Sequence, residues 1–167
     1  MKGFTLIEVI VAVAISLVIT GFVLVNYNSY NDTQTLKQAA LTLKNDLRFA
    51  QSEAITGVKP TPIPPSFTPV CDELTGFTVS FWSNSYTIRA ACNPQGPSGD
   101  VKTVTLPPGV TFSPVPPAIA FNVLSRGISL GSGLCLVLSG SGKTYKLGVT
   151  NSGDINDFGL QYSGACP

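Results

Sequence analysis

The chain has 167 residues, ten Lys and Arg against nine Asp and Glu, a formal net charge of +1, and no histidine. This length predicts one modest domain in addition to any anchor segment. A charge balance so close to zero argues against nucleic acid or an anionic surface as a partner. The absence of histidine removes the commonest acid–base group of enzymes, and no carboxylate pair is identifiable. The sequence therefore predicts a protein without enzymatic activity, cofactor or metal.

The N-terminal segment contains the strongest signal in the sequence. From Phe4 to Val25 the chain has 22 consecutive residues with a single charge, Glu8. As a helix they would extend roughly 33 Å, enough to cross the hydrocarbon core of a membrane. Lys2 before this run predicts a cytoplasmic N-terminus, with the rest of the chain on the far side of the cytoplasmic membrane. Signal peptides have a shorter apolar core with a small-residue cleavage site after it, whereas here the small residue, Gly3, precedes the core.

The run Gly3-Phe4-Thr5-Leu6-Ile7-Glu8 resembles the processing site of type IV prepilins and pseudopilins. The resemblance implies that a prepilin peptidase removes residues 1–3 by cutting after Gly3, that Phe4 becomes the N-methylated first residue, and that Glu8 serves assembly. An acid inside a membrane helix costs about 2.5–3.5 kcal/mol and is a functional candidate for that reason. The cationic α-amino group of Phe4 would lie about 6 Å along the helix from Glu8, within one chain or between chains. The alternative is an acid that reaches the headgroups from the helix end.

A second helical segment is expected at residues 26–57. Apolar residues recur at helical steps and polar residues occupy the other faces, and Gly57 and Pro60 end the helix. The stripe consists of Leu36, Ala40, Leu43, Leu47, Ala50 and Ala54. We expect it to pack on a globular domain. Residues 47–55 resemble the helix-end signature of the GspH/FimT family of minor pilins and H-type pseudopilins.

The remaining residues predict a β-rich domain. Residues 58–70 form a proline-rich connector, because proline fixes φ and lacks an N–H donor. Within 71–167 the apolar period changes to 2, and strand-like runs occur at 77–82, 86–90, 101–106, 110–112, 118–124, 134–138 and 144–150. The fold class is therefore α+β: a long N-terminal helix, with a transmembrane half and an amphipathic half, packed on an antiparallel sheet or small sandwich. This is the pilin fold that the resemblance implies.

Four cysteines, Cys71, Cys92, Cys135 and Cys166, lie in this domain, outside the membrane, where the compartment is oxidising. Four cysteines allow three pairings, among which sequence alone does not choose. The first hairpin brings Cys71 close to Cys92, which leaves Cys135 to hold Cys166, much as a C-terminal disulfide loop does in many pilins. A metal site is the alternative, but spacings of 21, 43 and 31 without C-x-x-C or histidine disfavour it.

Two short motifs point to other chemistry. Residues 140–144, GSGKT, resemble the end of a phosphate-binding loop, but Val137 stands where the first glycine would be, and strands flank the motif. A hairpin turn is the better interpretation. Residues 154–159 hold part of a calcium-loop pattern that lacks its later ligands.

The resemblance implies a structural subunit, most like a minor pilin of a type IV pilus. It would join other pilins from the cytoplasmic membrane through an inner-membrane assembly platform. Two alternatives remain open: a pseudopilin of a type II secretion system, and a minor pilin that binds DNA during uptake. The second is disfavoured, because the last 20 residues contain no Lys or Arg, and Lys143 and Lys146 alone are a weak basis for binding phosphates.

Overall fold

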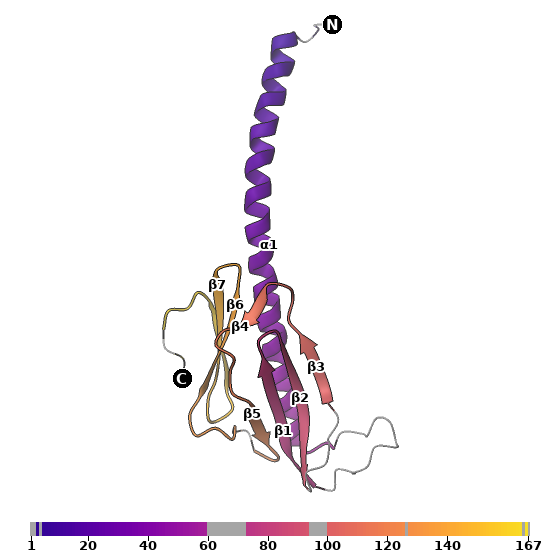
Figure 1. Ribbon diagram of the computed structural model, residues 1–167, viewed down its shortest axis with the longest axis vertical. Helices are drawn as coiled ribbons and strands as arrows, with labels where there is room; N and C mark the ends of the chain where they lie inside the picture. The colour runs from indigo at the N-terminus through magenta and orange to yellow at the C-terminus, as the bar shows by residue number, and fades with distance from the viewer. Residues whose placement is uncertain are drawn as a thin grey trace.

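The structure, a computed structural model, consists of a long helix followed by a β-rich domain (Figure 1). It describes residue 3 and residues 5–59, 73–93, 100–125, 127–164 and 166, with the backbone alone for 22–28. Helix α1 spans Leu6–Thr56, so one continuous helix contains both helical segments expected from the sequence. The α+β class is confirmed. Most of the proline-rich connector expected at 58–70 lies outside the described residues.

The C-terminal end of α1 is determined by a glycine. Gly57 adopts φ 65° and ψ 22°, and its N–H donates to the carbonyl oxygen of Glu53. This left-handed conformation is easily reached only by glycine, which is why helices commonly end at such a residue. The 51 residues of α1 correspond to a length of roughly 77 Å.

Two antiparallel four-stranded sheets follow the helix, in the orders β3-β2-β1-β5 and β4-β6-β7-β8. The strands are β1 Glu73–Trp82, β2 Ser85–Asn93, β3 Asp100–Thr105, β4 Val110–Phe112, β5 Ile119–Asn122, β6 Leu134–Gly140, β7 Lys143–Val149 and β8 Ile155–Leu160. The chain changes sheet at β4, at β5 and again at β6, so the two sheets are linked repeatedly.

The seven expected strand runs correspond to β1 through β7, with ends shifted by a few residues. The sequence prediction did not include β8. None of the side chains of β8 is fully buried, so no apolar alternation marks this strand in the sequence. It forms because its backbone pairs with β7 at the open edge of the second sheet.

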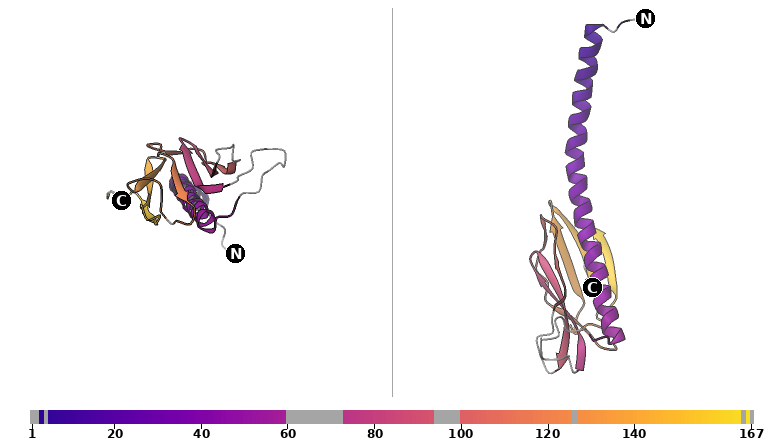
Figure 2. Two further views of the ribbon diagram at one scale, coloured as in Figure 1. Left: turned by 90° about the horizontal axis from the view of Figure 1, so that it is seen from below. Right: turned by 90° about the vertical axis from the view of Figure 1, so that its right-hand side faces the viewer.

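The apolar stripe of α1 is buried against both sheets. All six predicted stripe residues, from Leu36 to Ala54, have zero exposed surface. The helix packs on β1 and β5 of the first sheet and on β6, β7 and β8 of the second. Figure 2 shows α1 running along both sheets, with the first sheet on one side of it and the second sheet on the other.

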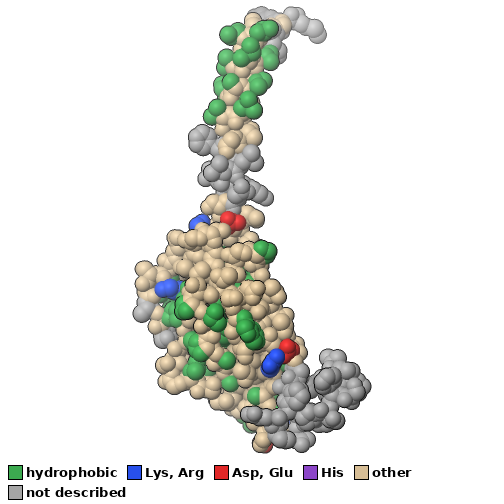
Figure 3. All heavy atoms as spheres, viewed as in Figure 1, with side chains coloured by type: hydrophobic (Ala, Val, Ile, Leu, Met, Phe, Trp, Pro, Cys, Tyr) green, Lys and Arg blue, Asp and Glu red, His purple; other side chains and the backbone are tan. Residues whose placement is uncertain are grey.

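The N-terminal half of α1 projects beyond the domain (Figure 1). Along the described part of the helix, the first hydrogen bonds to the domain are those of Asp32 and Thr33. These side chains accept from Ser141 Oγ at 2.8 Å and from Lys143 Nζ at 2.6 Å, both in or next to the β6–β7 turn. Apolar side chains are prominent along the projecting part (Figure 3).

A buried carboxylate ties the first sheet to the helix. Asp46 of α1, which is 6% exposed, accepts hydrogen bonds from Tyr86 Oη of β2 at 2.7 Å and from Lys102 Nζ of β3 at 2.6 Å. Burial, together with the hydrogen bond to Asp46, raises the pKa of Tyr86 well above its usual range. The hydroxyl therefore keeps its proton and remains a donor. We call Asp46, Tyr86 and Lys102 the first clasp.

A lysine, an aspartate and a tyrosine also connect the second sheet to the helix, but here the lysine is on the helix and the aspartate is on the sheet. Lys44 of α1 pairs with Asp157 Oδ2 of β8 at 2.9 Å, and Tyr145 Oη of β7 donates to Asp157 Oδ1 at 2.7 Å. Burial and the hydrogen bond to Asp157 raise the pKa of Tyr145 to about 12. Burial alone would raise the pKa of Asp157, but the hydrogen bonds from Lys44 and Tyr145 outweigh it and lower that pKa below its usual value. We call these residues the second clasp.

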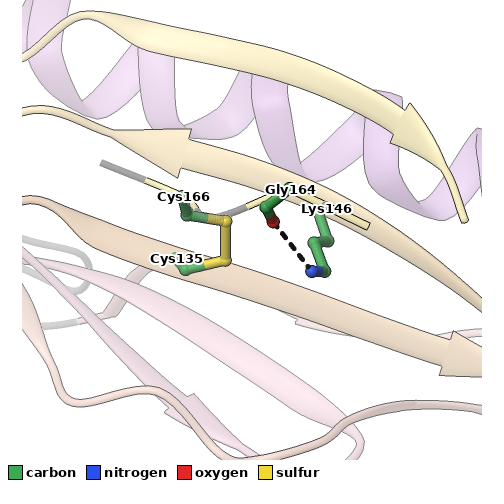
Figure 4. The surroundings of a disulfide bond; sticks show 4 residues. All are labelled: Cys135, Lys146, Gly164 and Cys166. Atoms are coloured by element: carbon green, nitrogen blue, oxygen red, sulfur yellow. Dashed lines mark hydrogen bonds between the residues drawn. A yellow bond between two sulfur atoms is a disulfide. The ribbon is translucent and has the colours of Figure 1, made fainter. Parts of the chain in front are cut away.

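The C-terminal segment is held against the second sheet. Cys135 of β6 forms a disulfide with Cys166, with the two Cα atoms 5.4 Å apart, which is the expected pairing. Beside it, Lys146 Nζ donates to the carbonyl oxygen of Gly164 at 3.3 Å (Figure 4). Cys92 is also disulfide-bonded, and Cys71, its expected partner, lies outside the described residues.

Removing the carboxylate of the first clasp should destabilise the domain. Asp46→Ala leaves the buried Tyr86 hydroxyl without its acceptor, and we expect the free energy of unfolding to fall by about 2–3 kcal/mol. Arg89→Ala, which breaks an exposed ion pair with Asp100, is the control and should cost about 1 kcal/mol or less. Urea unfolding of the full chain in detergent, followed by circular dichroism, measures both values. Equal losses for the two variants would contradict the buried role of Asp46.

The second clasp should make stability sensitive to acid. Because the pKa of Asp157 is lower in the folded than in the unfolded chain, its stabilisation is complete above about pH 5 and is lost as the pH falls through the folded value. Asp157→Asn should therefore destabilise the protein at about pH 7 and have little effect at about pH 2–3 in urea unfolding experiments. Asp100→Asn, in an exposed pair with Arg89, is the control and should have little effect at either pH. A loss for Asp157→Asn that is independent of pH would refute this assignment.

Candidate functional site

The candidate site lies at the N-terminal end of α1. Thr5 is the N-cap, with φ −81° and ψ 149°, and its Oγ1 accepts a hydrogen bond from the N–H of Glu8 at 3.4 Å. The two residues have the spacing of a capping box, and an acid in the first turn is favourable at the positive end of the helix dipole. Thr5 was not among the expected site residues, although the pattern Thr-x-x-Glu could have indicated it.

The predicted cleavage position lies outside the helix. Gly3 is exposed and precedes the N-cap, and a Cβ placed on it would meet nothing within 4 Å. Exposed positions near a chain terminus are preferred sites of proteolytic cleavage. Phe4 lies outside the described residues, so its expected roles as first residue and methylation site stay predictions.

Large apolar side chains surround the first turns of α1. Their exposed fractions range from 49% at Val11 to 78% at Leu6. They are Leu6, Ile7, Val9, Ile10, Val11, Val13, Ile15, Leu17, Val18 and Ile19. A folded monomer rarely exposes so continuous an apolar surface to water, and a helix that is apolar on all sides is suited to burial. We call residues 6–19 the apolar segment.

The hydroxyl groups within and next to the apolar segment are satisfied inside the helix. Ser16 Oγ donates to the carbonyl oxygen of Ala12, and Thr20 Oγ1 donates to that of Ser16, both at 2.8 Å. Such back-bonding lets a hydroxyl enter an apolar environment without losing a partner.

Within the part of the chain that the structure describes, no helical stretch has the length and hydropathy that a membrane span requires. The expected span, 4–25, includes Phe4 and the side chains of 22–25, which lie outside that part. The span stays a prediction.

Glu8 is the one ionisable residue among described positions 5–21. It forms no ion pair with any residue that the structure describes. A carboxylate that leaves water without a cationic partner is strongly destabilising. Burial of the apolar segment therefore requires one of three conditions at Glu8. A cation must lie close to its carboxylate, the carboxylate must bind a proton, or it must remain in contact with water.

The two other motifs have structural roles in the described residues. Ser141 and Gly142, with φ of 48° and 74°, form the β6–β7 turn, and Lys143 donates to Thr33, so residues 140–144 are the hairpin turn that the sequence favoured. In residues 154–159, Asp157 belongs to the second clasp and Asp154 accepts from Ser152 Oγ at 2.7 Å. Among the described residues, no group of three or more side chains is placed to hold a metal ion.

Comparison with known proteins gives one match. Residues 1–24 match the family model of the prokaryotic N-terminal methylation motif. Neither a curated protein nor a solved structure shows significant similarity to the chain. The matched residues include Gly3, Phe4 and Glu8, and thus coincide with the candidate site. This motif is a type IV pilin-like leader, and its presence indicates a type IV pilin-like protein or a pseudopilin.

Proposed function

We propose that the chain is a minor pilin-like structural subunit of a type IV pilus. The observation that carries this proposal is the apolar segment, with Glu8 as its only charge, on a helix whose other half is fixed to a folded domain. A helix that is apolar on all sides is stable in lipid or among similar helices. Assembly would transfer the segment from the first environment to the second.

Before assembly, the subunit resides in the cytoplasmic membrane as a single-pass protein with its N-terminus in the cytoplasm. The projecting residues 6–31 of α1 extend roughly 39 Å, more than the roughly 30 Å of the hydrocarbon core. Prepilin peptidase removes residues 1–3, and Phe4 is then N-methylated. The exposed position of Gly3 ahead of the N-cap supports access to this bond.

In the filament, Glu8 of one subunit pairs with the amino group of Phe4 in a neighbouring subunit. A carboxylate and an ammonium group attract each other strongly where water is excluded. The pairing also imposes a register, because a subunit seated elsewhere would leave a buried charge unpaired. The partners are thus other pilins, guided by an inner-membrane assembly platform.

The domain presents the same helix to its neighbours in one fixed orientation, because the two clasps and the buried stripe hold it. We propose no catalytic activity for it. A pseudopilin of a type II secretion system would have the same N-terminal motif and is the first alternative. DNA binding is less well supported, since Lys143 and Lys146 are engaged with Thr33 and Gly164.

Leader processing should depend on Gly3. In its own strain, the purified protein should lack Met1, Lys2 and Gly3 and carry one methyl group, and Gly3→Val should keep the full-length, unmethylated mass. Intact-protein mass spectrometry measures both. Gly21→Val is the matched control, because a Cβ at either glycine meets nothing within 4 Å, and it should be processed normally. An intact leader in the unmodified protein would refute the proposal.

Filament assembly should depend on Glu8. In a strain that lacks the gene, we expect sparse surface pili by electron microscopy and normal enzyme secretion. The intact gene and Ser16→Ala, the control, should restore the pili. Glu8→Ala should leave at least about tenfold fewer pili, since 1.4 kcal/mol already corresponds to a factor of ten and an unpaired charge costs more.

Two results would change the assignment. Normal pili together with secreted enzymes trapped in the periplasm would indicate the type II pseudopilin instead. Full restoration by Glu8→Ala would show that the carboxylate does not direct assembly.

A further inference from the structure

A hollow of about 460 Å³ lies on the first sheet at the β1–β2 turn, lined by Trp82, Ser83, Asn84, Ser85 and Thr87. This volume falls within the range of about 300–1,000 Å³ that is typical of small-molecule sites. Trp82, the single tryptophan of the chain, is 47% exposed, although a side chain of this size is usually largely covered. It lies opposite Ser85 on the outer face of the sheet, while the adjacent Phe81 is buried in the core.

Hydroxyl side chains surround the tryptophan on this face. Ser80 lies opposite Thr87, Thr87 opposite Thr103, and Ser85 opposite Thr105 in the strand register. Thr87 is only 4% exposed, and its hydroxyl shares a hydrogen bond of 3.2 Å with Thr103. Thr87 is thus largely covered, whereas the hydroxyls of Ser80, Ser85, Thr103 and Thr105 belong to partly or fully exposed residues and offer neutral donors and acceptors.

The backbone of the β1–β2 turn, next to Trp82, is fixed by hydrogen bonds to other parts of the domain. The carbonyl oxygens of Ser83 and Asn84 accept hydrogen bonds of 2.8 Å from the N–H groups of Phe112 and Leu106. The side chains of Ser83, Asn84 and Ser85 form no hydrogen bonds with any part of the chain that the structure describes. The fixed backbone lowers the entropic cost of binding a ligand, and the side chains keep their donors and acceptors available for it.

The charges on this face of the sheet limit the classes of ligand that the hollow could bind. None of the described residues that line the hollow is charged. Further along β2 on the same face, Arg89 pairs with Asp100. Figure 3 shows this face as mostly uncharged, with an acidic and a basic side chain side by side near one edge. Nucleic acid would require clustered cations, and a protein interface would require more large apolar side chains and fewer serines.

We propose that this hollow binds a neutral saccharide. A sugar ring has an apolar C–H face and a rim of hydroxyls, which match the plane of Trp82 and the Ser, Asn and Thr side chains around it. Because the hollow is open to solvent, it covers only part of a ligand, and a single site binds with modest affinity. The site lies on the opposite side of the sheet from α1, so this inference does not depend on the proposed assembly role.

The fluorescence of Trp82 provides a direct test, since no other tryptophan contributes. The full-length protein is kept in a zwitterionic detergent without sugar headgroups, because glycoside detergents would compete. It is titrated with maltotriose, cellotriose and the trimer of N-acetylglucosamine. We expect a saturable spectral shift with at least one of them. No saturable response to any of the three would overturn the proposal.

Ligand-observed NMR with the responding sugar extends the test to variants. Trp82→Ala should weaken binding at least about tenfold, equivalent to about 1.4 kcal/mol, while Trp82→Phe should stay within about threefold of the unmodified protein. Asn84→Ala should weaken it several-fold. Tyr30→Ala, which removes an exposed aromatic residue outside the domain, is the matched control. Circular dichroism verifies folding. Binding unchanged in Trp82→Ala, or saturation only by an oligodeoxynucleotide, would also overturn the proposal.

Discussion

The structure depends on one unbroken helix that has two different surroundings. Its backbone hydrogen bonds are satisfied within the helix from Leu6 to Thr56, so the backbone needs no partner wherever the helix lies. Only the side chains differ. From Leu36 onward a one-sided stripe is buried by the domain, whereas residues 6–19 are apolar and exposed. The domain therefore fixes the orientation of a surface that it does not cover.

The clasps explain how two sheets hold a helix without enclosing it. Lys44 and Asp46 are two residues apart, which places their side chains roughly 200° apart around the helix axis, on either side of the buried stripe. Asp46 thus reaches the first sheet and Lys44 reaches the second. Each carboxylate is shared by one lysine and one tyrosine hydroxyl, so no buried charge is left unpaired. The apolar stripe supplies the contact area, and these polar contacts select one rotation of the helix.

Much of this arrangement could be predicted from local sequence. The helical spacing of apolar residues predicted the buried stripe of α1, and Gly57 predicted the end of the helix. The alternation of apolar and polar residues predicted the first seven strands. Each of these signals is a property of neighbouring residues in the sequence. The clasps could not be predicted, since the helix residue of each clasp is separated from its sheet partners by 40 to 113 positions in the chain. The sequence left open a single sheet or a small sandwich, and the assignment of each strand to one of the two sheets could not be predicted for the same reason. Strand β8 was missed because it has no buried face. At the N-terminus, the motif predicts roles for Gly3 and Glu8, and the spacing Thr-x-x-Glu could also have indicated the N-cap that the structure places at Thr5.

The positions of the charged side chains explain why the apolar segment and the hollow at Trp82 are poor in charge. Lysines and acids of the domain are largely used within it: Lys44, Asp46 and Lys102 hold the helix, and Arg89 pairs with Asp100. Apart from Glu8, the residues of the apolar segment and those that line the hollow at Trp82 are uncharged. Long-range electrostatic attraction between exposed charges is screened by salt, whereas apolar packing and neutral hydrogen bonds are not. Contacts made through these two surfaces should therefore tolerate changes in salt concentration. In the proposed filament Glu8 would be the exception, because its pairing would be protected from salt only where neighbouring helices exclude water.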